Sequence, residues 1–146
     1  MRAVLQRVSK AEVRVDGISV GRIGYGWLLL LGIGHGDTEE IARKLAGKVV
    51  RLRMFSDAEG KFNLSALDIS AELLVVSQFT LYADTSRGRR PSFVDAAAPT
   101  FAAELVDRFV DIVRGYGLRV ETGRFGAHME VSLTNDGPVT VILEIQ

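Results

Sequence analysis

Three polar side chains stand where an apolar segment is expected to enter the core. Residues 73–76, LLVV, continue directly into residues 77–84, SQFTLYAD, which contain Ser77, Gln78 and Thr80. A buried hydroxyl or amide without a hydrogen-bond partner costs about 1–3 kcal/mol. These side chains are therefore either satisfied inside the core or line a site.

A hydroxyl nucleophile would need a base beside it, and the chain has two histidines, His35 and His128. One of them would have to approach Ser77 or Thr80 in space to activate it. They share no metal-ligand spacing with each other or with a nearby carboxylate, so no metal site is expected. Structural roles are favoured for both histidines.

A glycine-rich stretch, GIGHGD at residues 32–37, stands where a phosphate-binding loop would lie. Asp37 occupies the place of the third glycine of a dinucleotide fingerprint, and no G-K-[ST] motif follows. The spacing disfavours nucleotide binding here.

Net charge limits how the chain can bind nucleic acid. Eighteen basic residues balance eighteen acidic ones, so any contact with RNA must be local. The local candidate is SRGRRP at residues 86–91, with Arg87, Arg89 and Arg90. These arginines are either phosphate ligands or an ordinary solvated surface.

The stretch TNDGPVT at residues 134–140 has the composition of a turn between two strands. The Gly137-Pro138 bond can be cis, as about 5–6% of X-Pro bonds in folded proteins are. Local sequence does not decide between the isomers.

The elements that must position these residues alternate along the chain. Asp16-Gly17 predicts a hairpin over residues 12–20, and the unbroken apolar stretch 26–34 predicts a strand buried on both faces. Asp37 and Glu40 resemble a capping box that opens a helix over about 38–53.

A second helix is predicted over about 99–114, between Pro99 and Gly115. Its apolar positions are Phe101, Leu105, Phe109 and Val113. Further strands are expected at residues 72–82, 118–125, 128–135 and 139–146. The pattern predicts one domain over residues 1–146, an α/β, small, mixed and mainly antiparallel β-barrel-like domain with two helices packed on the sheet.

Composition predicts a cytoplasmic location for this domain. There is no cysteine, which suits a reducing compartment and excludes disulfides and thiolate metal sites. The longest apolar run, residues 27–31, is too short to span a membrane, and the start of the chain lacks a signal-peptide core. No cofactor and no membrane partner are expected.

Two stretches together resemble the signature motifs of the D-aminoacyl-tRNA deacylases, also called D-tyrosyl-tRNA deacylases. They are SQFTLYAD at residues 77–84 and NDGPVT at residues 135–140. Four further stretches fall in that family's order and spacing: LQRV at 5–8, FSDAEGKFNL at 55–64, SRGRRPSF at 86–93 and GRFGAHMEVSL at 123–133.

The resemblance implies a homodimeric hydrolase with active sites at the subunit interface. Its substrates would be the 3′ ends of D-aminoacyl-tRNA and of glycyl-tRNA mischarged on tRNA-Ala, cleaved to free tRNA and the amino acid as a proofreading step. A cis Gly137-Pro138 motif would reach into the partner's site, bind the substrate amino group and exclude L side chains.

The resemblance also assigns the other site residues. Ser77, Gln78, Phe79 and Thr80 would form the catalytic wall with its oxyanion and ribose contacts. Arg7 and Met129 would hold the Gly-Pro loop. Phe125 would lie near the terminal adenine, and Ala102 beside the pocket.

Strand geometry adds a condition to this assignment. A regular strand sends Ser77 and Phe79 to one face and Gln78 and Thr80 to the other, so the strand must end or bulge there if all four serve one pocket. Amides freed by such a break are possible oxyanion donors, which supply about 3–4 kcal/mol in acyl transfer.

Several alternatives remain open. Thr80 could be a covalent nucleophile, although hydrolysis by water assisted by the ribose 2′-hydroxyl is preferred. The chain could instead be a non-catalytic dimeric RNA-binding module, or a small-molecule esterase with Thr80 or Ser77 as nucleophile.

Overall fold

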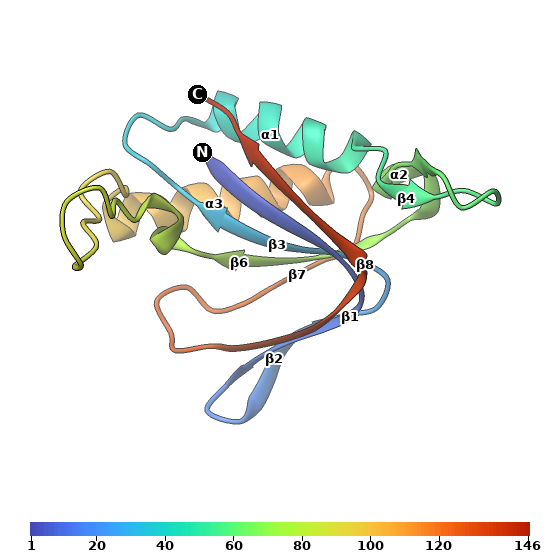
Figure 1. Cartoon of the computed structure of the whole chain (residues 1–146), viewed down its shortest axis with the longest axis horizontal. Coiled ribbons are helices and arrows are strands. Elements are labelled where there is room, and N and C mark those ends of the chain that lie inside the picture. Colours follow the sequence, from blue (N-terminus) through green and yellow to red (C-terminus); the bar gives the residue numbers. More distant parts are fainter.

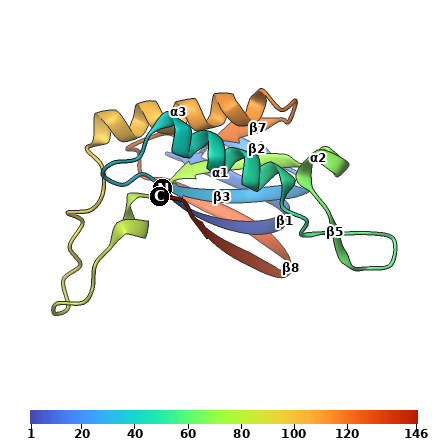
Figure 2. The same cartoon turned by 90° about the horizontal axis from the view of Figure 1, so that it is seen from above.

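The computed structural model describes all 146 residues, which form a curved sheet with helices over one face (Figures 1 and 2). The strands are β1 (Arg2–Val15), β2 (Ile18–Ile23), β3 (Gly26–Gly32), β4 (Phe55–Ser56), β5 (Phe62–Leu64), β6 (Glu72–Ser77), β7 (Val120–Thr122) and β8 (Glu130–Glu144). The helices are α1 (Glu39–Arg51), α2 (Ala66–Ile69) and α3 (Pro99–Arg114), with a 3₁₀ turn, η1 (Phe79–Tyr82). None of the helices is long and apolar enough to cross a membrane.

The long strand β1 organises the sheet. It pairs antiparallel with β8 along its length, with β3 near its start and with β2 near its end. The order continues from β3 through β6 to β7 by parallel pairing. Because β1 curves along its length, the sheet curls into a barrel-like shape (Figure 1). The mixed α/β, barrel-like class expected from the sequence is confirmed.

The helices α1 and α3 pack side by side on one face of the sheet (Figure 2). The start and end predicted for the second helix are confirmed by α3. Leu105, Phe109 and Val113 are buried against the sheet as the spacing predicts. Phe101 is 44% exposed, so the prediction that it belongs to the buried apolar face of this helix was wrong. It lies in the first turn of α3, before the helix reaches the sheet's centre.

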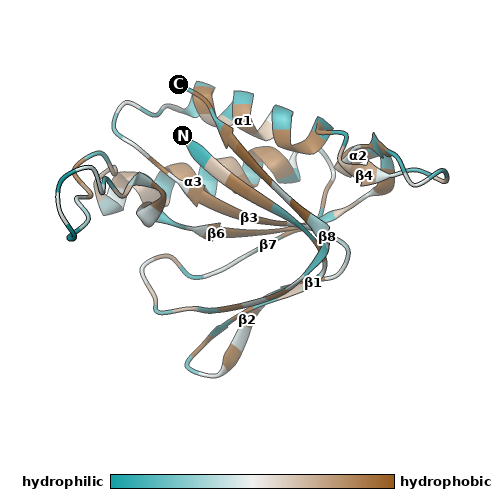
Figure 3. Ribbon diagram, in the orientation of Figure 1, coloured by the Kyte–Doolittle hydropathy of each residue, from teal (hydrophilic) through white to brown (hydrophobic).

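The opposite face of β3 and β6 is covered as well. Leu28 and Leu74 pack there against Val8 and Val13 of the curled β1. Strands covered on both faces carry continuous apolar sequence, which explains the hydrophobic central parts of β3 and β6 in Figure 3. The two-faced burial predicted for residues 26–34 is confirmed over β3.

Local turn and cap chemistry is partly as expected. Asp16 and Gly17 both have positive φ in the tight turn between β1 and β2, which confirms the hairpin. The predicted capping box at α1 is wrong: Thr38 is the N-cap and accepts from the Ile41 amide at 3.3 Å. Asp37 is buried instead, and its carboxylate binds the Met1 ammonium at 2.5 Å and the Gly34 amide at 2.7 Å.

The predicted turn at residues 134–140 is also wrong, because β8 continues through it. Thr140 pairs with Gln6 and Asn135 pairs with Val8, so residues 136–139 stand opposite Arg7 alone. We call residues 135–139 the Gly-Pro bulge. A bulge adds residues to one strand without reversing the chain.

Core burial predicts a stability difference between two phenylalanines of α3. Phe109→Ala should lower the free energy of unfolding by about 3–5 kcal/mol, because Phe109 is fully buried. Phe101→Ala should change it by less than about 1 kcal/mol, since that ring is half-exposed. Urea unfolding of both variants checks this, and equal losses would contradict it.

Candidate functional site

The strand that carries the polar stretch, β6, ends at Ser77, and an end or a bulge there was the condition for residues 77–80 to share one pocket. Ser77 is the last residue of β6, opposite Leu31, and the Gln78 amide still donates to the Leu31 carbonyl at 2.8 Å. The chain then turns into η1. The first amides of a helical turn have no acceptor within it. The amides of Phe79 and Thr80 also make none of the backbone hydrogen bonds found in the turns and loops, so they are candidate donors for a ligand.

The end of β6 opens onto an apolar cavity of about 740 Å³. It lies between β6, the start of α3 and the loop that precedes β8. Six of the residues predicted for the site line it: Ser77, Gln78, Phe79, Ala102, Phe125 and Met129. The structure therefore brings together residues from three distant parts of the sequence.

Thr80 does not line this cavity in the single chain. Its side chain is exposed, and its hydroxyl accepts a hydrogen bond from the Gln78 side-chain amide. No imidazole is hydrogen-bonded to Thr80 or to Ser77. Neither hydroxyl is therefore paired with a general base.

Both histidines line the cavity, a position that the sequence analysis missed. The His35 imidazole Nε2 lies 2.8 Å from the Val94 carbonyl oxygen, so it tethers a neighbouring segment. His128 is exposed, in the loop before β8. Neither belongs to a group of three or more metal-binding side chains.

The segment from Phe93 to Pro99 forms a wall of the cavity that sequence reasoning also missed. The Ala97 amide donates to Ile33 at 3.0 Å and the His35 amide donates to Asp95 at 3.1 Å. These bonds join the segment to the loop after β3. No local signal announces them, because each depends on pairing between chain segments about sixty residues apart.

The Gly-Pro bulge lies elsewhere on the same chain. Its Gly137-Pro138 peptide is cis, and Gly137 has φ 149°. Both residues are exposed, and neither lines the cavity of its own chain. The Gly137-Pro138 dipeptide therefore lies on the surface of the chain, outside this cavity.

Arg7 holds the bulge from the opposing strand. The side chain is buried, and its Nε donates to the Asp136 carbonyl at 3.0 Å and lies 3.1 Å from the Asp136 carboxylate. Its guanidinium also donates to the Met54 carbonyl at 2.9 Å. The side-chain amide of Asn135 closes the bulge by donating to the backbone carbonyl of Arg7 at 2.8 Å and to that of Val139 at 2.9 Å.

Met129 lies at the cavity rather than at the bulge of its own chain. Its sulfur accepts a hydrogen bond from the Arg124 amide at 3.4 Å. Support of a Gly-Pro loop by Met129 therefore requires the loop of a second subunit, and stays a prediction.

The arginine loop, residues 84–92, projects beyond the sheet (Figure 2) and lies in the sequence between Phe79 and Phe93, which both line the cavity. Asp84 and Ser92 close its base through two backbone hydrogen bonds of 2.8 and 2.9 Å. The Ser86 amide donates to the Asp84 carboxylate at 2.9 Å and holds the pKa of that carboxyl below its usual range. Arg87, Arg89 and Arg90 are exposed and make no ion pair.

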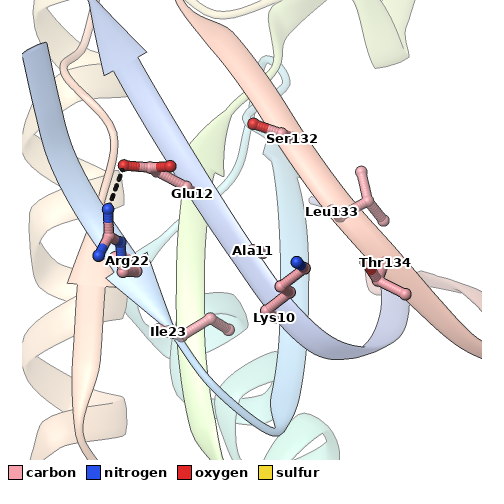
Figure 4. Close-up of a pocket in the computed structure, with 8 residues that line it drawn as sticks. All are labelled: Lys10, Ala11, Glu12, Arg22, Ile23, Ser132, Leu133 and Thr134. Atoms are coloured by element: carbon pink, nitrogen blue, oxygen red, sulfur yellow. Dashed lines mark hydrogen bonds and ion pairs between the residues drawn. The ribbon is translucent and has the colours of Figure 1, made fainter.

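A second cavity, of about 510 Å³, lies between β1, β2 and β8 (Figure 4). Two of its charged side chains are already paired with each other, since Glu12 accepts from Arg22 at 2.9 Å. Hydrogen bonds from Arg22 and Ser19 lower the pKa of Glu12 to about 2. None of the residues predicted for the site lies there, so the cavity beside β6 is the candidate active site.

Comparisons with known proteins agree with the geometry. The model of the D-Tyr-tRNA(Tyr) deacylase family matches residues 4–144. A D-aminoacyl-tRNA deacylase of Roseiflexus sp. (strain RS-1) is 63% identical over 99% of this chain and 93% of its own length. The deacylase of Thermosipho africanus (strain TCF52B) is 56% identical over 99% of this chain and 97% of its own.

Solved structures show the same fold. A structure titled c-Myc DNA Unwinding Element Binding Protein superposes with a TM-score of 0.94 and 39% identity, over 100% of this chain and 99% of that one. A probable eukaryotic D-amino acid tRNA deacylase superposes with a TM-score of 0.84 at 22% identity, over 99% and 98%. At that identity the second likeness concerns the fold alone.

Proposed function

The chain belongs to the D-Tyr-tRNA(Tyr) deacylase family of hydrolases, and from this premise we propose that residues 1–146 form one deacylase domain that cleaves D-aminoacyl-tRNA. Its substrates are D-amino acids, or glycine mischarged on tRNA-Ala, esterified to the terminal ribose. Its products are free tRNA and the amino acid. The observation that carries the proposal is the apolar cavity at the end of β6, beside free backbone amides.

The amides of Phe79 and Thr80 are the proposed oxyanion donors. They lie at the end of a strand fixed by pairing with β3, so they need no rearrangement when charge develops on the ester oxygen. One preorganised donor of this kind accounts for about 100- to 1,000-fold in rate. Ser77 and Gln78 complete the wall that positions the ester.

The nucleophile is proposed to be water, assisted by the ribose 2′-hydroxyl. Attack joins the water oxygen to the ester carbon, breaks the bond from that carbon to the ribose oxygen, and returns a proton to the ribose. The absence of a base hydrogen-bonded to Thr80 or Ser77 favours this route over an acyl-enzyme. The protein then acts mainly by positioning.

Chirality checking is proposed to require a homodimer. The Gly-Pro bulge is exposed and lies outside the cavity of its own chain, as a group that serves a partner's cavity must. Backbone carbonyls of Gly137 and Pro138 would accept from the substrate amino group and leave no room for an L side chain. Met129 of the receiving subunit would contact the inserted bulge.

Turnover tests the function directly. Substoichiometric enzyme should release many equivalents of amino acid from D-aminoacyl-tRNA and glycyl-tRNA and leave L-aminoacyl-tRNA intact. An RNA-binding module would bind the same tRNA without turnover. An esterase would cleave simple activated esters without RNA. Either outcome would overturn the proposal.

The arginine loop should contribute affinity without stereoselectivity. If Arg87, Arg89 and Arg90 bind phosphates, each Arg→Ala change should weaken tRNA binding and reduce the slope of log affinity against log salt by about one. The preference for D over L substrate should not change. Lys44→Ala on α1 is the control, since that side chain is exposed but paired with Glu40. Unchanged salt slopes in all three arginine variants would rule out phosphate contact.

A further inference from the structure

Two phenylalanine rings stand uncovered at the base of the arginine loop. Phe79 is 56% exposed and Phe93 is 37% exposed, although both also line the cavity. Their ring centroids lie 5.0 Å apart at an interplanar angle of 63°, an edge-to-face pair. Aromatic surface left in water is unfavourable, so a paired and partly exposed arrangement beside a cavity suggests a ligand.

The backbone around the two rings is well constrained. Phe79 opens η1 directly after β6, and the Asp84–Ser92 bridge brings the chain back beside it. The Ala96 amide then donates to the Phe93 carbonyl at 3.0 Å. Exposure of these rings is therefore not the result of a loosely held loop. The pair is held in place with its outer surface free.

Charge next to the pair indicates what kind of ligand covers it. Arg90 lies three positions before Phe93 in the sequence, and Arg87 and Arg89 precede Arg90. None of the three arginines has an ion-pair partner. Aromatic faces beside unpaired arginines are the combination that binds single-stranded nucleic acid, in which bases stack on the rings and phosphates meet the guanidinium groups.

We propose that the Phe79–Phe93 pair is a stacking platform for the unpaired nucleobase that precedes the terminal adenosine of the tRNA acceptor end. This inference rests on the proposed function, in which the cavity holds the terminal aminoacyl-adenosine. The preceding nucleotide then leaves the cavity over its rim, where the two rings lie and the arginine loop begins.

Substrates of two lengths distinguish stacking on the Phe79–Phe93 pair from binding in the cavity. Two D-aminoacyl substrates are compared: an oligonucleotide of the last three acceptor nucleotides, and adenosine alone. Phe93→Ala should lower kcat/KM about 10-fold further on the oligonucleotide than on adenosine, which is the effect of one lost base stack. Phe93→Trp should retain the rate on both substrates. Phe93→Leu should behave like alanine, because it keeps apolar volume but has no aromatic face.

Val94→Ala is the matched control. Val94 is the next residue and is 76% exposed, but its side chain does not line the cavity. Val94→Ala should leave kcat/KM unchanged on both the oligonucleotide and the adenosine substrate. Equal losses on both substrates for Phe93→Ala would mean that Phe93 only shapes the cavity, and no loss on either would also overturn the platform.

A binding measurement separates this inference from the proposed function. A non-hydrolysable acceptor oligonucleotide carries 2-aminopurine in place of the base before the terminal adenosine. Its fluorescence should be quenched by wild type and by Val94→Ala, but not by Phe93→Ala or Phe93→Leu. Quenching by a wild type that does not hydrolyse D-aminoacyl-tRNA would remove the proposed function and keep the platform. Hydrolysis without quenching would overturn the stacking platform and keep the proposed function.

Sedimentation tests whether the two rings contact a second copy of the chain instead. If only Phe93→Ala loses the dimer, the pair belongs to the subunit interface and the platform is overturned.

Discussion

Gly137→Ala is expected to lower kcat/KM for D-aminoacyl-tRNA by about 100-fold while affinity for uncharged tRNA stays near wild type. A displacement of about 1 Å in a positioning group is sufficient for a loss of this size. Gly137 has φ 149°, which side-chain-bearing residues rarely adopt, and an added Cβ would lie 2.6 Å from both the Val139 amide nitrogen and its Cγ2. The bulge must therefore shift, and with it the carbonyls proposed to hold the substrate amino group.

Gly17→Ala is the control for backbone strain alone. Gly17 also has a positive φ, 76°, but an added Cβ would meet nothing within 4 Å, and the turn lies at the end of the β1–β2 hairpin. This variant should lose about 1–2 kcal/mol of stability and keep its rate. A Gly137→Ala enzyme with wild-type rates would show that the Gly-Pro bulge is not the chirality filter.

Mixed dimers show whose cavity the bulge serves. One subunit carries Gly137→Ala, and the other carries Ala127→Trp, which obstructs the cavity from its lining loop. Each homodimer should be nearly inactive. The mixed dimer should regain activity, because the intact cavity of the first subunit receives the intact bulge of the second. No recovery in a mixed dimer confirmed by sedimentation would mean that each bulge acts within its own chain, or not at all.

Replacing the terminal adenosine by 2′-deoxyadenosine is expected to reduce cleavage by at least about 100-fold, the usual size of one general acid–base contribution. Thr80→Val should retain cleavage of the normal substrate within about 10-fold. The reason is that the Thr80 hydroxyl is engaged by Gln78 and has no base, whereas the ribose hydroxyl adjoins the ester in every substrate.

The opposite pattern would identify Thr80 as the nucleophile. In that case Thr80→Val would abolish cleavage and the deoxy substrate would be cut normally. Mass spectrometry of enzyme quenched during turnover is an independent check, because an acyl group on Thr80 or Ser77 would contradict hydrolysis by water. Ser77→Ala is the companion variant, since Ser77 is the hydroxyl that lines the cavity.

Features with a local cause could be predicted from the sequence. The Asp16-Gly17 turn, the buried strand β3 and the limits of α3 each follow from turn chemistry, hydrophobic periodicity or capping within a few residues. The strand predicted over residues 72–82 was too long, since β6 ends at Ser77 and residues 79–82 form η1, although strand geometry had indicated an end or a bulge there if residues 77–80 share one pocket. Motifs then identified the family, and with it six residues that line one cavity.

Tertiary structure decided the features that depend on distant partners. Asp37 leaves the helix cap because the Met1 ammonium lies beside it, and β8 continues through Gly137-Pro138 because β1 pairs with it on both sides of the bulge. Likewise, β3 and β6 pair in parallel, which brings His35 and the segment after Phe93 into the same wall as Ser77. Local sequence restricts only backbone torsion and hydrophobic period. Which side chains share a cavity is set by strand order and register, and those are determined by the free energy of the whole packed chain.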